Sequence, residues 1–232
     1  FGVRVFRHPH PVGQFRCSSL AVAFMFASST SAETISLPQP KISGGKVLNE
    51  VLNNRKSVRE FYNTELTREQ LSQILWAANG VTKRYDGKGH VNPAAMGIYA
   101  VDVYAVMKDG IYLYKPEKHS LELVVKGDFR STTTTGQDFV KVAPLNLVYV
   151  ENISAWDKSS RPVDRERQPI FANIAAGAMA QSVALAAGNE SLGNCVRASV
   201  DVKAFTKAAK LSAKQKVLFA QTVGDSPLVA KG

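Results

Sequence analysis

The chain has 232 residues, of which 45% are hydrophobic and 21% charged, a balance that suits one globular domain with a sizeable core. Its formal net charge is +10 at pH 7. The basic residues are dispersed and form no Lys/Arg-rich run or nucleic-acid-binding signature, so we expect no nucleic-acid partner. Two cysteines and four scattered histidines offer no metal-ligand spacing, and no metal is expected.

The first 32 residues are typical of a secretory signal peptide with an upstream extension at 1–15. An apolar core at 20–27 is too short to span a bilayer, and the small residues after it offer a small-x-small cleavage site ending at Ala32. We expect cleavage there, a mature chain starting at Glu33, export to the bacterial periplasm and no stable membrane anchor. The alternative is a buried N-terminal helix, which the Ser-rich flanks disfavour.

Helices are expected early in the remaining chain. Residues 33–45 lack periodicity and are predicted to form an extended leader, with the domain proper over 46–232. Apolar residues at helical spacing predict a short amphipathic helix over 47–52. Thr67, followed three residues later by a glutamine, is a capping-box pattern that starts a second helix, ending at Gly80.

The middle of the chain is mostly predicted as strand. Residues 84–92 are polar and glycine-containing, which indicates a loop. Alternating, Val/Tyr-rich sequence over 98–107 turns through Lys-Asp-Gly into 111–114 and predicts a hairpin. Residues 121–125 can add a strand, and the continuous apolar run 145–150 predicts a covered central strand.

The C-terminal part alternates helix and strand. We expect a short helix over 137–142, a long Ala/Gly-rich helix over 170–188, a helix over 202–210 capped by Asp201, and a strand over 216–223. Interleaved helices and strands together with a hairpin predict an α+β fold, with a mixed central β-sheet flanked by helices.

The long helix over 170–188 is the expected core of a homodimer. Its small side chains allow another helix to approach closely, and a helix that is apolar on nearly every side is buried on nearly every side. Ala176 and Ala180 are the positions at which a bulky side chain is predicted to disturb that interface.

A cationic cluster follows the first predicted helix. Two arginines, a lysine and a serine within five residues can give a phosphoryl group several charge-assisted hydrogen bonds. The alternative is a solvated helix end, where late cations favour the helix dipole. The cluster consists of Arg55, Lys56, Ser57 and Arg59.

Together with the segments 66–80 and 93–104, this cluster resembles the nitroreductase-like FMN-dependent oxidoreductases. The resemblance extends from about Lys46 to the C-terminus and is closest to the SagB-type dehydrogenase branch. It implies a nitroreductase-like fold and a homodimer with two flavin sites at its interface. It also implies that the FMN phosphate and ribityl chain are held by Arg55, Lys56, Ser57 and Arg59.

The family's second contact region is matched by 93–99. Ala94 stands where relatives usually have serine, and Gly97 stands where many have an asparagine that contacts the flavin ring. Contacts from Ala94, Ala95 and Gly97 are therefore expected through the backbone.

The third region, 192–201, is similar to the loop that runs under the flavin in relatives. The resemblance places the backbone N–H groups of Ala198 and Ser199 against flavin N5 and O4. For Arg197 two roles stay open, a cation near N1 and O2 that stabilises the reduced flavin or a surface salt bridge. Lys231 would close the phosphate site or be solvated.

No acid/base constellation competes with a flavin. The sequence lacks a G-x-S-x-G elbow, an H-E-x-x-H motif and a P-loop, and His90 and His119 lie in polar stretches. The resemblance implies ping-pong hydride or electron transfer through flavin N5 between a small-molecule donor and acceptor, such as a nitroaromatic, a quinone or a substrate being dehydrogenated. The alternatives are a non-catalytic flavin carrier or sensor, and a cationic module for a phosphate-bearing ligand.

Overall fold

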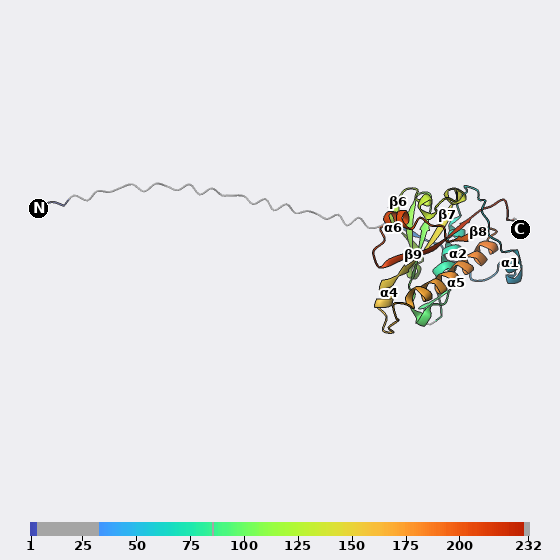
Figure 1. Ribbon diagram of the computed structural model, residues 1–232, viewed down its shortest axis with the longest axis horizontal. Helices are drawn as coiled ribbons and strands as arrows, with labels where there is room; N and C mark the ends of the chain where they lie inside the picture. The colour runs from blue at the N-terminus through green and yellow to red at the C-terminus, as the bar shows by residue number, and fades with distance from the viewer. Residues whose placement is uncertain (4–32, 85, 230–232) are drawn as a thin grey trace. The chain divides into compact units, whose positions relative to one another are not determined.

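The computed structural model describes residues 1–3, 33–84 and 86–229. The chain divides into two units, 1–31 and 32–232, and every element below belongs to the second (Figure 1). The expected signal peptide and Lys231 lie outside the described residues.

A seven-stranded sheet runs through the second unit in the order β1-β6-β5-β4-β7-β9-β8. Neighbouring strands pair antiparallel, and one isolated parallel bridge joins Ser57 to Asn194. The sheet consists of β1 (Thr34–Ser36), β4 (Val101–Val106), β5 (Gly110–Lys115), β6 (Ser120–Lys126), β7 (Leu145–Asn152), β8 (Gly193–Arg197) and β9 (Gln215–Gly224). The molecule thus has the expected α+β architecture, and within the described ranges the parallel pairing consists of this bridge.

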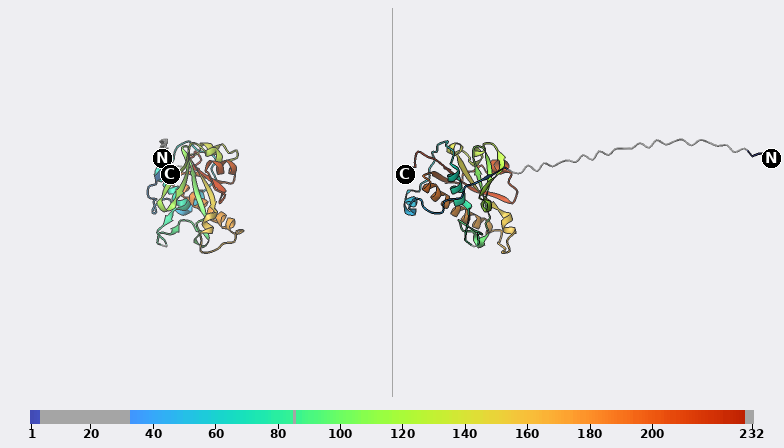
Figure 2. Two further views of the ribbon diagram at one scale, coloured as in Figure 1. Left: turned by 90° about the vertical axis from the view of Figure 1, so that its left-hand side faces the viewer. Right: turned by 180° about the vertical axis from the view of Figure 1, so that it is seen from behind.

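Helices cover both faces of this sheet. The long helices α2 and α5 lie side by side against one face, and α6 lies on the other (Figures 1 and 2). The α-helices are α1 (Leu48–Asn54), α2 (Arg68–Asn79), α3 (Phe139–Val142), α4 (Ile153–Asp157), α5 (Gln168–Asn189) and α6 (Val202–Ala208). Three short 3₁₀ segments are η1 (Ala95–Gly97), η2 (Pro116–Lys118) and η3 (Arg130–Thr133).

Local sequence signals account for most of these elements. Thr67 caps α2 through the expected capping box, and the Asp201 carboxylate accepts from the N–H of Ala204 at the start of α6. The predicted hairpin is formed by β4 and β5, and β7 is buried from Leu145 to Glu151 as a central strand should be.

Among the described residues, four strands were not predicted from the sequence: β1, β2 (Val81–Thr82), β3 (Gly89–His90) and β8. β1 lies in the expected leader and pairs with β6 of its own chain. β3 lies in the expected 84–92 loop and pairs with β2. β8 lies in the region expected, from the family resemblance, to be a loop under the flavin, and its residues form a strand because they pair with β9.

The environment of α5 also differs from the prediction. Ala176 and Ala180 are buried against the sheet of their own chain, whereas Ile170 and Ile174 on the opposite side are 57% and 64% exposed. By length and composition α5 could cross a membrane, but 44% of its apolar window is buried inside this fold. The expectation of burial on nearly every side is wrong for the single chain, because an exposed apolar stripe remains.

Candidate functional site

The cationic cluster follows α1 in an extended conformation. Arg55 has φ −59° and ψ 122°, so the chain leaves the helix there. Side chains alternate in extended chain, and the buried Val58 takes the inward position. Its neighbours Ser57 and Arg59 are exposed, so the segment presents a hydroxyl and a guanidinium to solvent next to the exposed Arg55 and Lys56.

Two contacts fix this segment beside the start of β8. The N–H of Val58 donates to the Asn194 carbonyl at 2.8 Å, and Ser57 forms the parallel bridge to the same residue. Val58 is 1% exposed, and a Cβ on Gly193 would lie 3.0 Å from a methyl group of Val58. Glycine at 193 thus permits the close approach that anchors the cluster.

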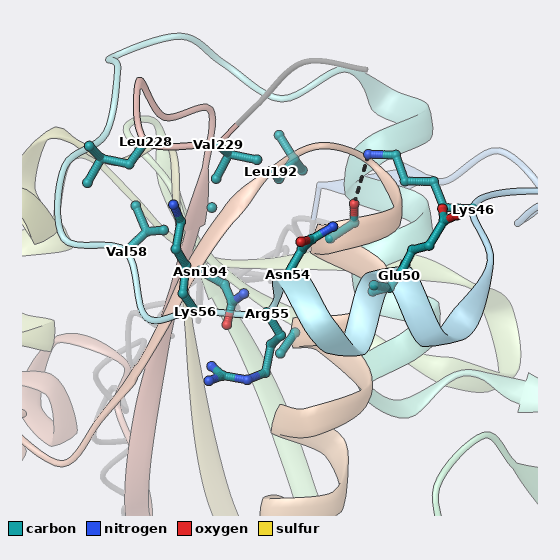
Figure 3. Close-up of a pocket in the computed structure, with 14 residues that line it drawn as sticks. Lys46, Glu50, Asn54, Arg55, Lys56, Val58, Leu192, Asn194, Leu228 and Val229 are labelled. Carbon is teal, nitrogen blue, oxygen red and sulfur yellow. Dashed lines mark hydrogen bonds between the residues drawn. The ribbon is translucent and has the colours of Figure 1, made fainter.

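A pocket of about 400 Å³ opens beside the cluster. It is bounded by α1, the last turns of α5, the start of β8 and the C-terminal segment (Figure 3). Arg55, Lys56 and Asn194 lie together on one side of it, whereas Lys46 and Glu50 lie on another. Ser57 and Arg59 do not line this pocket. The lining residues are Lys46, Glu50, Val51, Asn54, Arg55, Lys56, Val58, Ala184, Gly188, Leu192, Gly193, Asn194, Leu228 and Val229.

The cations of the cluster are available to a ligand. Arg55, Lys56 and Arg59 are exposed, and within the described part of the chain none of them forms an ion pair. Lys46 differs, because its Nζ donates to the Gly188 carbonyl at 3.2 Å at the C-terminal end of α5, where a cation favours the helix dipole.

β8 connects this pocket with the third predicted contact region. Asn194 lines the pocket, and Val196, two residues further on the same face, is 46% exposed. Cys195 points to the other face and is buried, as expected for a small core residue. The five residues of β8 span roughly 13 Å between its two ends.

Backbone donors are open at the far end of β8. Ala198 is exposed and Ser199 half-buried, and within the described residues neither N–H donates a hydrogen bond to a backbone or side-chain acceptor. The Ser199 hydroxyl lies 2.6 Å from that of Thr135, which ties this loop to the neighbouring one.

Arg197 is buried rather than at the surface. Its guanidinium donates to the carbonyl and hydroxyl of Thr133, to Asn146 Oδ1 at 3.0 Å, to Thr222 Oγ1 at 2.9 Å and to the Ser199 carbonyl at 3.0 Å. Burial lowers the pKa of Arg197 to about 10, so it stays charged at neutral pH. The surface salt bridge is therefore wrong, because the side chain is 5% exposed and every acceptor is neutral.

The face on which Arg197 lies gives it a scaffolding role. Arg197 shares a face with Thr222, opposite to the face that carries Asn194 and Val196. Its bonds to Thr133 and to the Ser199 carbonyl hold two loops together. Arg197 thus positions the segment that carries the Ala198 and Ser199 donors.

The second predicted segment forms η1. Met96 and Gly97 have φ 54° and 72°, in the left-handed region that favours glycine. Within the described chain the N–H groups of Ala94 and Ala95 donate no hydrogen bond. Ala94 and Gly97 line a cavity of about 650 Å³, which shares no lining residue with the pocket beside Arg55.

The two histidines named from sequence have structural partners. His90 is buried, stacks on Tyr99 with ring centroids 3.6 Å apart and hydrogen-bonds the Asn79 amide oxygen. His119 contacts the Tyr114 hydroxyl and the Pro38 carbonyl. Neither faces the cationic cluster.

Comparison with known proteins identifies the family. The chain matches the Nitroreductase family over residues 52–225. It belongs to the nitroreductase family. It is 32% identical over 171 residues to a protein of Methanocaldococcus jannaschii described as a nitroreductase, which covers 69% of this chain and 82% of the relative.

Solved structures agree with this assignment. A Ralstonia eutropha protein described as a nitroreductase is 35% identical, with a TM-score of 0.77 over 88% of this chain and 92% of that one. Nitroreductase A of Vibrio parahaemolyticus, 18% identical, has the same fold with a TM-score of 0.59 over 82% and 72%. The expected nitroreductase fold and membership in an oxidoreductase family are confirmed.

The residues present fit the flavin that nitroreductases typically bind. Among the described residues, cations without ion-pair partners lie near one end of β8, and open N–H donors lie just past its other end, with a strand of roughly 13 Å between them. A phosphate at the first end and a polar ring edge at the second match this donor set. Sequence reasoning missed Lys46 and Asn194, whose roles depend on contacts between segments far apart in the chain.

Proposed function

We propose that this nitroreductase is an FMN-dependent oxidoreductase. Arg55, Lys56, Ser57 and Arg59 would hold the FMN phosphate and ribityl chain. The observation that carries the proposal is this cluster of exposed, unpaired cations anchored by Val58 to the start of β8. Because these cations have no ion-pair partner among the described residues, each can give charge-assisted hydrogen bonds to a bound phosphate.

The backbone at the other end of β8 would orient the flavin ring. The N–H groups of Ala198 and Ser199 can donate to it, and Arg197 would keep them in place through the Ser199 carbonyl. Bound FMN would supply hydride or electron transfer at N5 in a ping-pong cycle between a small-molecule donor and a nitroaromatic, quinone-type or dehydrogenated substrate.

The enzyme is further proposed to be a homodimer, as nitroreductases generally are. The exposed stripe of α5 at Ile170, Ile174 and Gly177 continues onto exposed leucines of the adjacent α1, an apolar surface of the kind that marks an interface. Gly177 leaves open space beside the helix, which suits close packing by another helix.

A dimer would also complete the flavin site. In one chain the Arg55 cluster lies near the C-terminal end of α5, whereas the cavity with Ala94 and Gly97 includes Arg161, which precedes α5. The helix has 22 residues and is about 33 Å long. Antiparallel packing of two α5 helices would bring the η1 segment of one protomer toward the cationic cluster of the other.

Two finer assignments rest on sequence. The small residues Ala94 and Ala95 together with Tyr99 support the SagB-type dehydrogenase branch. The N-terminal signal supports export to the periplasm with cleavage after Ala32. Glu33, the new N-terminal residue, is joined to Lys126 by an ion pair of 2.8 Å, and β1 begins at the next residue, so cleavage would keep every named element.

The visible spectrum of the protein purified without added cofactor tests the proposal. Bound FMN is expected to give a yellow protein, and heat-released FMN should be stoichiometric with the chain. Turnover is then measured with NADH, NADPH and dithionite as donors and with a nitroaromatic and a quinone as acceptors. A colourless protein that takes up no added FMN would contradict the assignment.

A flavin carrier or sensor is the second candidate function. The absence of polar side chains at Ala94, Ala95 and Gly97 favours it, since relatives usually place serine and asparagine there. A carrier would bind FMN and exchange it with free flavin while showing no multiple turnover with any of the donors. Steady-state reduction of an acceptor would exclude it.

A further inference from the structure

The cavity beside η1 carries positive charge that the flavin assignment leaves unexplained. Arg84, Lys88 and Arg161 line it, and none of the described residues that line it is a carboxylate. Arg84 comes from the segment between β2 and β3, and Arg161 comes from the segment between α4 and α5. Three cations from two distant parts of the sequence therefore meet at one opening.

These cations are not neutralised by the protein. Within the described residues Lys88 and Arg161 form no ion pair, and Arg84 donates to the His90 carbonyl at 2.9 Å without meeting an acid. The contrast lies close by, where Arg165 pairs with Asp157 at 2.9 Å. Asp157, four residues before Arg161, therefore pairs with Arg165 and Lys214 and not with Arg161.

Apart from Asn92, the other side chains that line the cavity are apolar or aromatic. His90 and Tyr99 stack with ring planes 18° apart, and the backbone N–H of His90 donates to the Tyr99 hydroxyl at 3.1 Å. The Asn79 amide oxygen holds the imidazole from behind at 2.8 Å. Pro93 and Met96 add apolar surface, with Met96 43% exposed. A rigid aromatic wall and a cationic rim favour a flat ring that bears a negative charge.

We propose that this cavity binds the anionic group of a planar aromatic acceptor, and that Lys88 and Arg161 select carboxylate-bearing substrates over neutral ones. Ala94 and Gly97 line the same cavity, so a ring held there lies beside the segment assigned to the flavin. The inference rests on the proposed function for the fate of the bound ring. Its recognition step does not depend on turnover.

The first measurement is equilibrium binding to the purified protein. Calorimetric titrations with 4-nitrobenzoate and 4-nitrobenzamide, which differ in charge but hardly in shape, give the preference directly. The wild type is expected to bind the carboxylate about tenfold more tightly, the size of effect that two exposed ionic contacts give together. That preference should shrink as salt is raised from low to about 0.5 M. Equal affinities in the wild type at low salt would overturn the proposal.

Variants locate the contacts. Lys88→Gln with Arg161→Gln should reduce the preference to about twofold or less. Lys203→Gln with Lys207→Gln, two exposed residues of α6 on the other face of the sheet, removes the same charge and should keep it. The proposed site is contradicted if the Lys88 and Arg161 double variant keeps the preference for the carboxylate, or if the Lys203 and Lys207 double variant loses it. Single variants and the salt series on the wild type give the answer if the double variant fails to fold.

Kinetics and flavin content separate this inference from the proposed function. In turnover, the Lys88→Gln, Arg161→Gln double variant should have a KM for 4-nitrobenzoate about tenfold above that of the wild type. Its KM for 4-nitrobenzamide and its flavin content should equal those of the wild type. Charge selectivity in binding without turnover would sink the enzyme assignment and leave the cavity assignment standing. Turnover without charge selectivity would support the enzyme assignment and overturn the cavity assignment. Loss of bound flavin from the variants would overturn the proposal, since the cations would then belong to the flavin site.

Discussion

Arginines near the two ends of β8 have opposite environments. At its C-terminal end Arg197 is 5% exposed and donates to four residues. Near its N-terminal end Arg55 and Arg59 are exposed and, among the described residues, have no ion-pair partner. The same side-chain type thus stabilises the fold at one end and remains free for a ligand at the other.

This difference separates positioning from binding. A buried guanidinium is costly to desolvate, so it persists only where several acceptors replace water. Arg197 has those acceptors, and they belong to the loops at Thr133 and Ser199. An exposed guanidinium costs little in the free protein and can give its full hydrogen-bonding capacity to an anion. Stability and flavin affinity should therefore respond to different arginines.

The largest predicted effect is the loss of stability when Arg197 is removed. Arg197→Ala leaves the Thr133 and Thr222 acceptors without their guanidinium donor, and Asn146 Oδ1 keeps only the Thr222 hydroxyl, which should lower the free energy of unfolding by about 4 kcal/mol. Guanidinium unfolding followed by circular dichroism measures it. Arg197→Lys should recover only a small part of this stability, because a compact ammonium lacks the planar fork with which a guanidinium reaches all these acceptors at once.

The matched control lies at the other end of the strand. Arg59→Ala should change the free energy of unfolding of the flavin-free protein by no more than about 0.5 kcal/mol. Two results would contradict the contrast between a stabilising Arg197 and a ligand-binding Arg59. One is a loss of more than about 2 kcal/mol in the free energy of unfolding of the Arg59 variant, and the other is a smaller loss in the Arg197 variant than in the Arg59 variant.

The second effect concerns FMN affinity. Arg55→Ala with Arg59→Ala should remove two charge-assisted contacts, worth about 3 kcal/mol together, and weaken FMN binding about a hundredfold. Fluorescence titration of the flavin-free protein with FMN gives the dissociation constant. Riboflavin, which lacks the phosphate, should bind wild type and variant alike. Full flavin occupancy in the purified double variant would refute the phosphate site.

Sequence patterns predicted the parts of this molecule that depend on local chemistry. The capping box at Thr67, the cap at Asp201 and the apolar run of β7 each specify an element through neighbours a few residues away. The cationic cluster was also visible, because its residues are contiguous and their charge does not depend on the fold.

Features that depend on distant segments could not be predicted in the same way. The side of β8 on which Arg197 lies depends on pairing with β9, and a short strand containing Gly, Asn and Cys gives no periodic signal. Ala176 looked like an interface residue because α5 is apolar all round, yet it is fully buried against the sheet. The cavity cations at Arg84 and Arg161 are 77 positions apart, and no local pattern links them.

The third prediction concerns the exposed apolar stripe of α5. It tests whether dimerisation through this stripe completes the flavin site next to the N-terminal end of β8. Ile174→Glu places a charge on the apolar stripe in both protomers and should weaken dimer association at least about thirtyfold. Sedimentation velocity reports the association state, and absorbance reports retained flavin. Val202→Glu is the control, since Val202 is 50% exposed on α6, away from the stripe. A wild type that sediments as a monomer while holding stoichiometric FMN would contradict the dimer.

The smallest predicted effect extends the comparison to a neutral anchor, His119. Its ring contacts the Pro38 carbonyl at 3.0 Å and the Tyr114 hydroxyl at 2.8 Å, which fastens the segment after β1. Burial lowers the pKa of His119 below its ordinary 6.5, against the opposing effect of the Pro38 carbonyl. The unfolded chain then binds a proton more readily than the folded one, so the free energy of unfolding should fall as pH decreases below about 6.5.

His119→Asn tests this anchor, because asparagine tolerates the left-handed backbone found here, with φ 45° and ψ 58°. The variant should be less stable than wild type at pH 8, where its lost contacts matter, and should lose less stability than wild type between pH 8 and pH 5.5. Burial also lowers the pKa of His90, so part of the wild-type pH dependence should remain in the variant. Guanidinium unfolding of both proteins at the two pH values measures the difference. An equal or steeper loss in the variant would show that His119 titrates as it does in the unfolded chain, and that its contacts with Pro38 and Tyr114 add no pH-dependent stability.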